Sequence, residues 1–238
     1  MITSASNNRD SDISSYLQAA LEPFRLCTCF YSVLSCFEPA LHDVEDLQAT
    51  PAFVQSDLFE AWSAFCDLAQ SRINILKRYK SASYISLKPC GSLKCAEIHR
   101  KRVLMRCSGC KRQYYCSRRC QSVDWEDGHR TACPRLVSAN RDEPEHLTTR
   151  DKSFLRALIN HDYNLSQLDI LRYELDFINA YPDRMPCLVF DYSGGPLNFR
   201  FLCEHGPNRH VHSDLEDDAL RVARSGGRIQ LHFVRLPY

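Results

Sequence analysis

Apolar residues recur at steps of three and four between residues 55 and 80, and this spacing predicts a long amphipathic helix. One face of that helix carries the apolar side chains Leu58, Trp62, Phe65, Ala69, Ile73 and Leu76. Charged residues are left for the other faces, among them Asp57, Glu60, Asp67, Arg72 and Lys77. We interpret the apolar stripe as a packing face rather than as a ligand site.

The chain before this helix also has helical character. The first ten residues are polar, and we expect them to fray. Residues 11–21 predict a helix that Pro23 ends, and the apolar run Phe24–Phe37 before Pro39 predicts a buried helix. Residues 1–87 are therefore predicted to form a helical N-terminal region.

A polar and charged stretch, residues 137–151, predicts a linker. After it, two helices are predicted over residues 152–163 and 166–180. Ser166 is the expected N-cap of the second helix, which Pro182 closes.

In the last part of the chain the pattern of apolar and polar residues changes from helical spacing to short apolar runs. The short apolar runs CLVFDY and LNFRFLC flank the turn sequence SGGP and predict a hairpin. A helix over residues 214–224 and a final strand over residues 228–236 follow. Residues 152–238 are thus predicted to be a small α+β region, and the whole chain is predicted to be of the α+β class.

Composition excludes several classes of protein. The chain of 238 residues is 44% hydrophobic and 25% charged, and it has only 8 Gly and 11 Pro, which excludes collagen-like and low-complexity sequence. No apolar stretch reaches the roughly 18 residues that a membrane-spanning helix needs. We expect a soluble, intracellular protein without a signal peptide.

Cysteine is the informative residue, with 13 in the chain. A chain of this size without an export signal does not need disulfides, so reduced thiols that bind metal are favoured. Seven of them gather with His129 between residues 90 and 133, where they form the series Cys90, Cys95, Cys107, Cys110, Cys116, Cys120 and Cys133. The scattered ones are interpreted as core residues: Cys27, Cys29, Cys36, Cys66, Cys187 and Cys203.

Eight soft or borderline ligands match two closed tetrahedral zinc sites. The pair Cys116 and Cys120 lies at the start of a predicted helix with Ser117 as cap, and the pair His129 and Cys133 lies near its end. About nine residues of helix, or roughly 13 Å, separate the two pairs, which is too far for one ion. Two structural zinc ions per chain are therefore predicted.

The sequence CSGCKRQYYCSRRCQSVDWEDGHRTAC resembles a MYND zinc finger, with its YC-x3-CQ-x2-DW core and final H-x3-C. The resemblance covers residues 90–133 within a finger region of 88–136, and the flanks are similar to uncharacterised fungal MYND-containing proteins. It implies interleaved ligands, with Cys90, Cys95, Cys116 and Cys120 for one zinc and Cys107, Cys110, His129 and Cys133 for the other. The first pair departs from the family, because four residues stand between its cysteines instead of two. His99 is the alternative to Cys95.

The resemblance also implies a function. MYND fingers mostly bind short proline-containing peptides of partner proteins, often transcriptional corepressors. The matching surface positions are Ser108, Gln121 and Trp125, of which the last two are four residues apart on one helical face. The alternative for Trp125 is packing inside the finger. This interpretation makes the chain a non-enzymatic interaction protein of the nucleus or cytoplasm.

Nucleic-acid binding is the competing hypothesis. Residues 88–136 hold 12 Lys and Arg against 4 Asp and Glu, whereas the rest of the chain holds 18 against 25. The candidate phosphate contacts are Arg100, Lys101, Arg102, Lys111, Arg112, Arg118 and Arg119.

Two other hypotheses are weaker. A remnant of a SET-MYND lysine methyltransferase would need a Gly-rich cofactor motif, but no Gly precedes Cys90. A third metal site would use His205, His210 and His212 with Cys203 and Asp214, but this stretch is typical of a polar loop.

Overall fold

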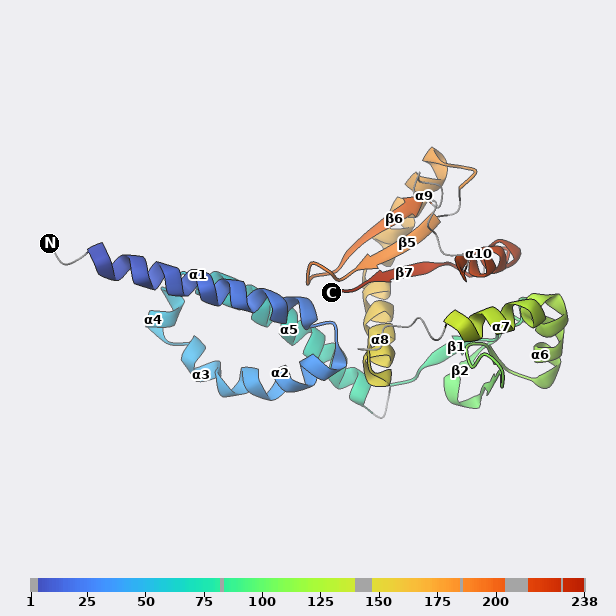
Figure 1. The fold of residues 1–238 in the computed structure, drawn as a ribbon, viewed down its shortest axis with the longest axis horizontal. Helices are drawn as coiled ribbons and strands as arrows, with labels where there is room; N and C mark the ends of the chain where they lie inside the picture. Colours follow the sequence, from blue (N-terminus) through green and yellow to red (C-terminus); the bar gives the residue numbers. More distant parts are fainter. Residues whose placement is uncertain are drawn as a thin grey trace.

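The computed structural model describes residues 4–81, 84–139, 147–184, 186–203, 214–227 and 229–237 (Figure 1). It confirms the α+β class: helices dominate, and the strands form two small hairpins and one sheet of three strands. None of the helices in these residues combines the length and the apolar character that a bilayer crossing requires. The histidines considered for a third metal site lie outside the described residues.

Helices make up the N-terminal region. They are α1 (Ser4–Cys27), α2 (Tyr31–Asp43), α3 (Glu45–Gln48), α4 (Pro51–Val54) and α5 (Phe59–Lys80). Helices α1 and α5 lie side by side along the long axis of the molecule (Figure 1). The predicted stripe on α5 is confirmed as a packing face, since Phe65, Ala69, Ile73 and Leu76 are buried.

Three N-terminal predictions were wrong. Backbone helix begins at Ser4 within the segment expected to fray, and Pro23 lies inside α1 instead of ending it. The apolar run Phe24–Phe37 is split by a turn at residues 28–30 into the end of α1 and the start of α2. Packing explains the tolerated proline, because Phe24 meets Phe37 with ring centroids 5.7 Å apart and α1 packs along α5.

Arg72 was predicted to lie on a face of the helix away from the packing face, but it is buried. Only 3% of it is exposed, and its guanidinium donates to Thr28 Oγ1 and to the carbonyl oxygen of Gly195. The ring of Tyr192 lies 5.4 Å from the guanidinium carbon. A charged residue on the helix therefore joins the end of α1 to the C-terminal sheet.

The C-terminal region contains α8 (Thr149–Leu165), α9 (Gln167–Ala180) and the three-stranded sheet in the order β6 (Asn198–Cys203), β5 (Pro186–Asp191), β7 (His232–Arg235). The predicted hairpin is confirmed, with Leu188 opposite Phe201 in the antiparallel pair β5–β6. The final strand runs parallel to β5. Helix α10 (Asp214–Arg224) precedes it, as predicted, and Ser166 precedes α9 without a side-chain cap bond.

One apolar core joins the two ends of the chain. Residues of α2 and α5, such as Leu34 and Leu76, pack with Phe154 of α8 and with Leu188 and Phe190 of β5. The elements between α5 and α8 form a second, smaller cluster around cysteine side chains. These elements are β1 (Leu87–Pro89), β2 (Ile98–Arg100), η1 (Lys101–Val103), β3 (Met105–Arg106), β4 (Tyr114–Tyr115), α6 (Arg118–Asp124), η2 (Trp125–His129) and α7 (Arg130–Ala139).

Candidate metal centre

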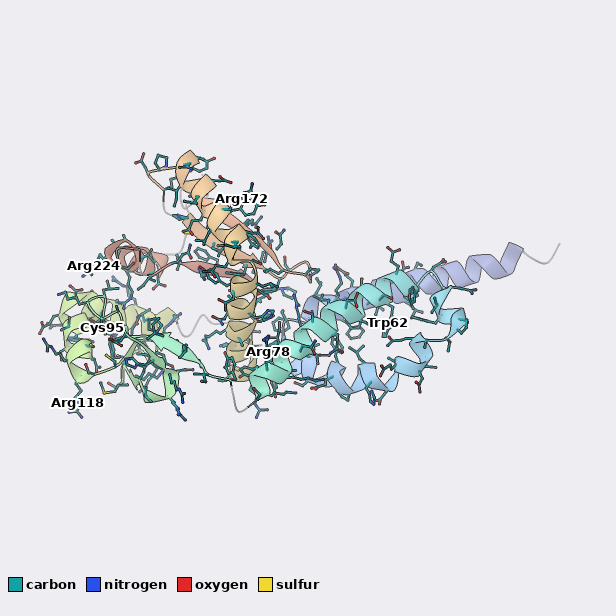
Figure 2. The ribbon with its side chains drawn as sticks, turned by 180° about the vertical axis from the view of Figure 1, so that it is seen from behind. Trp62, Arg78, Cys95, Arg118, Arg172 and Arg224 are labelled. Carbon is teal, nitrogen blue, oxygen red and sulfur yellow. The ribbon has the colours of Figure 1, made fainter. Side chains whose placement is uncertain are left out.

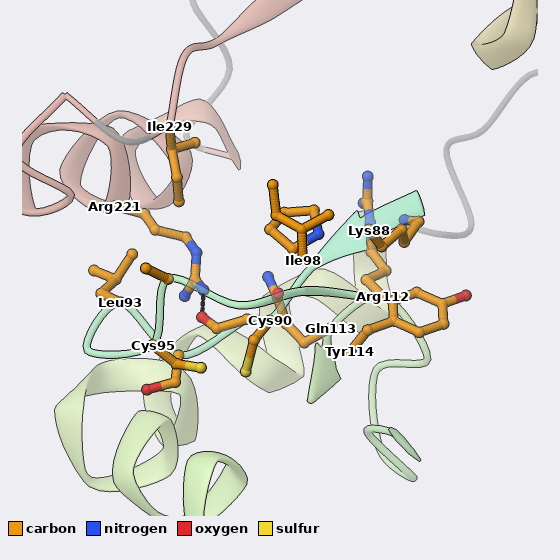
Figure 3. A pocket seen from close by; sticks show the side chains of 14 residues that line it. Lys88, Cys90, Leu93, Cys95, Ile98, Arg112, Gln113, Tyr114, Arg221 and Ile229 are labelled. Atoms are coloured by element: carbon orange, nitrogen blue, oxygen red, sulfur yellow. Dashed lines mark hydrogen bonds between the residues drawn. The ribbon is translucent and has the colours of Figure 1, made fainter. Parts of the chain in front are cut away.

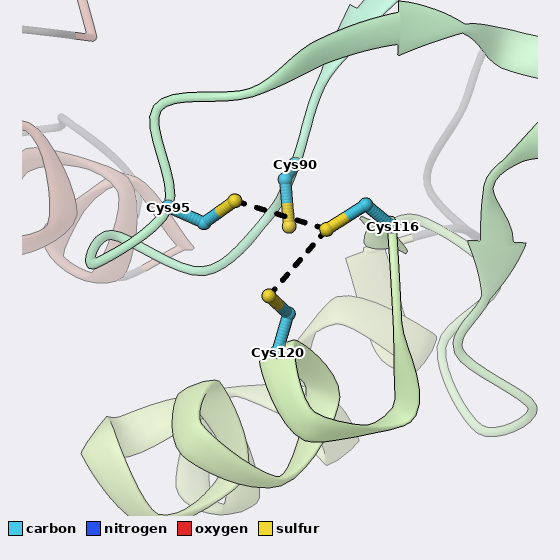
Figure 4. A group of neighbouring side chains, drawn as sticks. All are labelled: Cys90, Cys95, Cys116 and Cys120. Atoms are coloured by element: carbon cyan, nitrogen blue, oxygen red, sulfur yellow. Dashed lines mark hydrogen bonds between the residues drawn. The ribbon is translucent and has the colours of Figure 1, made fainter.

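The first cluster brings together the four thiols of Cys90, Cys95, Cys116 and Cys120 (Figure 4). Cys90 follows β1, and Cys95 lies in the loop that leads to β2. The loop is fixed by backbone bonds from Cys90 N to Glu97 O and from Cys95 N to Ser92 O. Cys116 follows β4, and Cys120 lies in the first turn of α6. The four-residue spacing of the first pair is thus accommodated by a turn within the loop.

The second cluster brings together Cys107, Cys110, His129 and Cys133, and all four are buried. The first two lie in the turn between β3 and β4, and the last two lie on η2 and α7. At Gly109, a Cβ atom would lie 2.9 Å from Cys133 Sγ, so the turn closes on the cluster only because this residue has no side chain. The pairs interleave along the chain, as the resemblance implied.

The distances between donor atoms fit zinc. Around a tetrahedral ion with Zn–S near 2.3 Å and Zn–N near 2.0 Å, two sulfurs lie about 3.8 Å apart and a sulfur and a nitrogen about 3.5 Å apart. In the first cluster, Cys116 Sγ lies 3.7 Å from Cys95 Sγ and 3.5 Å from Cys120 Sγ.

The second cluster has the same dimensions. Cys107 Sγ lies 3.9 Å from Cys133 Sγ, and His129 Nε2 lies 3.4 Å from Cys107 Sγ and 3.7 Å from Cys110 Sγ. Each cluster supplies four protein donors, which completes a tetrahedral set without a position for substrate.

His99, the alternative to Cys95, is not in either cluster. It lies on β2 opposite Lys88, and its buried Nε2 has no hydrogen-bond partner among the described residues. The structure therefore brings Cys95 to the first cluster.

The helix that was predicted to carry both ligand pairs is interrupted. Ser117 is its N-cap as predicted, because its hydroxyl accepts from Cys120 N at 3.2 Å, but Cys116 lies before the cap. Gly128 then adopts φ 133°, which breaks the helix between α6 and α7 just before His129. A residue with a side chain rarely adopts this conformation, so the glycine sets the direction from which His129 meets the second cluster.

A buried polar network supports the second cluster. Asp124, which is 3% exposed, accepts a hydrogen bond from the Tyr115 hydroxyl at 2.7 Å and pairs with Arg221 of α10 at 3.2 Å. Burial, together with the Asp124 carboxylate, raises the pKa of Tyr115, so the phenol stays a donor. Burial also lowers the pKa of His129, which favours the neutral imidazole that binds metal.

The three predicted partner-binding residues lie on different elements of the finger, each close in the chain to residues of the two clusters. Ser108 is an exposed residue of the Cys107–Cys110 turn, and Gln121 lies on α6. The Trp125 side chain is 40% exposed, and its ring packs edge-on against His129 with centroids 5.8 Å apart. One side of the Trp125 ring therefore packs on a buried residue of the finger, while part of the side chain is accessible to solvent.

Residues 90–133 match the family model of the MYND finger. This segment is a MYND finger. No curated protein and no solved structure matches the chain significantly. The MYND finger is a non-catalytic module that generally mediates protein–protein interaction, and the match leaves the remaining parts of the chain without an assigned family.

Sequence reasoning missed the residues that attach α10 to the MYND finger. Besides its pair with Asp124, Arg221 donates to the carbonyl oxygen of Gly91, and Arg224 pairs with Asp127 at 2.9 Å. Figure 2 shows Arg224 and Cys95 at the same end of the molecule, far from Trp62. Two arginines three residues apart on an otherwise acidic predicted helix were the available signal.

Proposed function

We propose that this protein is a non-enzymatic interaction protein. Its MYND finger, held by two zinc ions, binds short proline-containing peptide segments of partner proteins, and this binding serves transcriptional regulation. The ions have a structural role in this proposal, because each cluster closes with four protein donors.

The observation that carries the proposal is the exposure of Trp125 on a rigid support. Its backbone keeps helical torsion angles of φ −60° and ψ −48°, so Trp125 and Gln121 share one helical face. A large flat ring beside an amide donor and acceptor suits a proline-containing segment, which offers apolar rings and free carbonyl groups. Packing against His129 reduces the side-chain entropy that binding would cost.

The ion and its stoichiometry are tested by metal analysis of the purified chain. We expect two zinc ions per chain and the release of seven thiols when a chelator removes them, one for each cysteine in the two clusters. Cys116→Ser should lower the ratio to one or less, because the first site loses a donor.

Cys36→Ser is the matched control for this measurement, since Cys36, which was expected in the core, is exposed and outside both clusters. It should keep the full zinc content. A wild-type ratio near one would contradict the first site and the MYND-type surface that depends on it.

Peptide binding is tested with Trp125→Ala. This change should reduce the affinity for proline-containing peptides selected from a displayed library by tenfold or more, as expected for loss of an aromatic anchor. The zinc content should stay at the wild-type value, because Trp125 is not a donor. Binding is measured by isothermal titration.

The control is Tyr16→Ala, which removes an aromatic side chain that is 76% exposed on α1. Its affinity for the same peptides should be unchanged. Full peptide affinity in Trp125→Ala with intact zinc would contradict the assignment of this surface.

A further inference from the structure

Two cavities of the MYND finger region are both lined by Tyr114. One, of about 590 Å³, lies between residues 84–86 and the segment of η1 and β3. The other, of about 520 Å³, lies over the loop of the first cluster, with Lys88, Arg112 and Tyr114 at one end and Arg221 at the other (Figure 3). We call the two together the Tyr114 groove.

Cationic side chains dominate the lining of the Tyr114 groove, whose acidic groups are the thiols of Cys90 and Cys95 from the first cluster. Its lining includes the cationic residues Lys88, Arg100, Lys101, Arg102, Arg106, Arg112 and Arg221, and no Asp or Glu among the described residues lines it. Three of these cations surround the same ring, with Lys88, Arg106 and Lys101 at 4.5, 5.6 and 5.8 Å from the Tyr114 centroid.

Six of the seven cations have no acidic partner among the described residues. Where the chain is described, Arg221 alone of the seven has a carboxylate within ion-pair distance. By contrast, Lys94 of the finger and Arg224 of α10 are both paired with Asp127. The formal charge of residues 88–136 is +8 without metal. A zinc site with four thiolates contributes −2 and one with three thiolates contributes −1, so the zinc-loaded finger keeps a charge of about +5 and stays basic.

Aromatic and apolar surface accompanies the charge. Tyr84 is 38% exposed in the groove, beside Ile85 and Leu104. A cationic track with aromatic rings is the arrangement that binds single strands, because phosphates contact the cations and bases stack on the rings. A ligand whose only charges are carboxylates would use the cations without needing the rings.

We propose that the Tyr114 groove binds single-stranded nucleic acid, with phosphates on Lys101, Arg102 and their neighbours and a base stacked on Tyr84. The first cavity is lined by a loop, a short turn and strand ends, so it offers no helix for a DNA major groove. The site is separate from the Trp125 surface and does not depend on peptide binding there.

The test measures the binding of a fluorescein-labelled oligothymidylate of about ten nucleotides to the full chain by anisotropy. The double variant Lys101→Glu/Arg102→Glu should bind at least tenfold more weakly than the wild type. Its affinity should also depend less on salt, with the slope of log K against log salt reduced by about 1.4, since each lost phosphate contact removes about 0.7.

The matched control is Arg118→Glu/Arg119→Glu. It makes the same change in net charge, on exposed residues that the sequence offered as phosphate contacts but that line neither cavity. Its affinity should fall less than threefold. An equal loss in both double variants would show attraction by net charge alone and would overturn the proposal, provided that metal analysis finds two zinc ions in each.

Three further measurements test the groove. Tyr84→Ala should weaken binding about tenfold with an unchanged salt slope, because it removes stacking and no charge. A polyglutamate peptide should compete poorly with the oligonucleotide. Competition as strong as that of unlabelled oligothymidylate would overturn the proposal and assign the groove to an acidic protein partner. Trp125→Ala should bind the oligonucleotide normally, so this site and the peptide surface can fail separately.

Discussion

The carboxylate of Asp151 accepts hydrogen bonds at the N-termini of two helices. It is 2% exposed, and its Oδ2 accepts from Thr148 N and Thr148 Oγ1, which completes the capping box of α8. Its Oδ1 accepts from Ser32 N and Ser32 Oγ at the start of α2, where the N-cap residue Phe30 provides no side-chain bond. The carboxylate therefore satisfies donors that both helix termini would otherwise leave free.

The ionised form of Asp151 is the stabilising one. Burial alone would raise the pKa of this carboxyl, but the hydrogen bonds from Thr148 and Ser32 outweigh burial and lower the pKa. A lowered folded-state pKa means that the stabilisation is complete above the unfolded-state pKa of about 3.9 and is lost as the pH falls through the folded-state value.

Asp151→Asn should lower the free energy of unfolding at neutral pH by about 1 to 3 kcal/mol, because buried donors lose a charged acceptor. The difference from wild type should shrink once the pH falls below about 4. Urea unfolding of both proteins from neutral pH to below pH 4 measures this difference in the free energy of unfolding. Acid also releases zinc, but it does so in both proteins alike. Asp169→Asn, at an exposed site on α9, should change little. A difference that stays constant with pH would contradict the role of the carboxylate.

At the scale of elements, the sequence correctly predicted those helices and strands that the local pattern of apolar, polar and turn residues determines. The stripe on α5, the hairpin β5–β6 and the helix α10 were all predicted from periodicity and turn residues, because each is consistent with its own local sequence. The two clusters were predicted from ligand spacing and family resemblance, and the structure brings the same eight residues together. That they bind zinc, and that Ser108, Gln121 and Trp125 contact a partner, stay predictions.

The wrong element predictions have a common cause, which is contact with distant parts of the chain. Pro23 remains helical because α1 packs along α5, and Arg72 is buried because its partners are on the turns after α1 and after β5. Neither partner is visible in a local window of sequence. The interruption at Gly128 is different, because a glycine in the sequence permits a positive φ but does not by itself require one.

At the scale of the molecule, the MYND finger is inserted into the chain between two parts of one core. Leu34 and Leu76 precede the finger and Phe154 and Leu188 follow it, yet they pack in one cluster. The finger is then contacted again by α10, which packs on α7. The C-terminal region thus restrains both the core and the finger, so a finger cut from the chain would lose the α10 arginines that pair with Asp124 and Asp127.

This arrangement predicts that zinc retention depends on Arg221, which is almost 100 residues away from Asp124 in the chain. Arg221→Met leaves a buried carboxylate without its cation, so a chelator should extract zinc several times faster than from wild type, as followed with a colorimetric zinc indicator. Arg224→Met is the matched control, because its pair is half exposed and contributes little. Adding Asp124→Asn to Arg221→Met should restore slower extraction, since the neutral amide needs no cation and still accepts from Tyr115. Equal extraction rates in the two single variants would contradict a structural link between α10 and the metal centre.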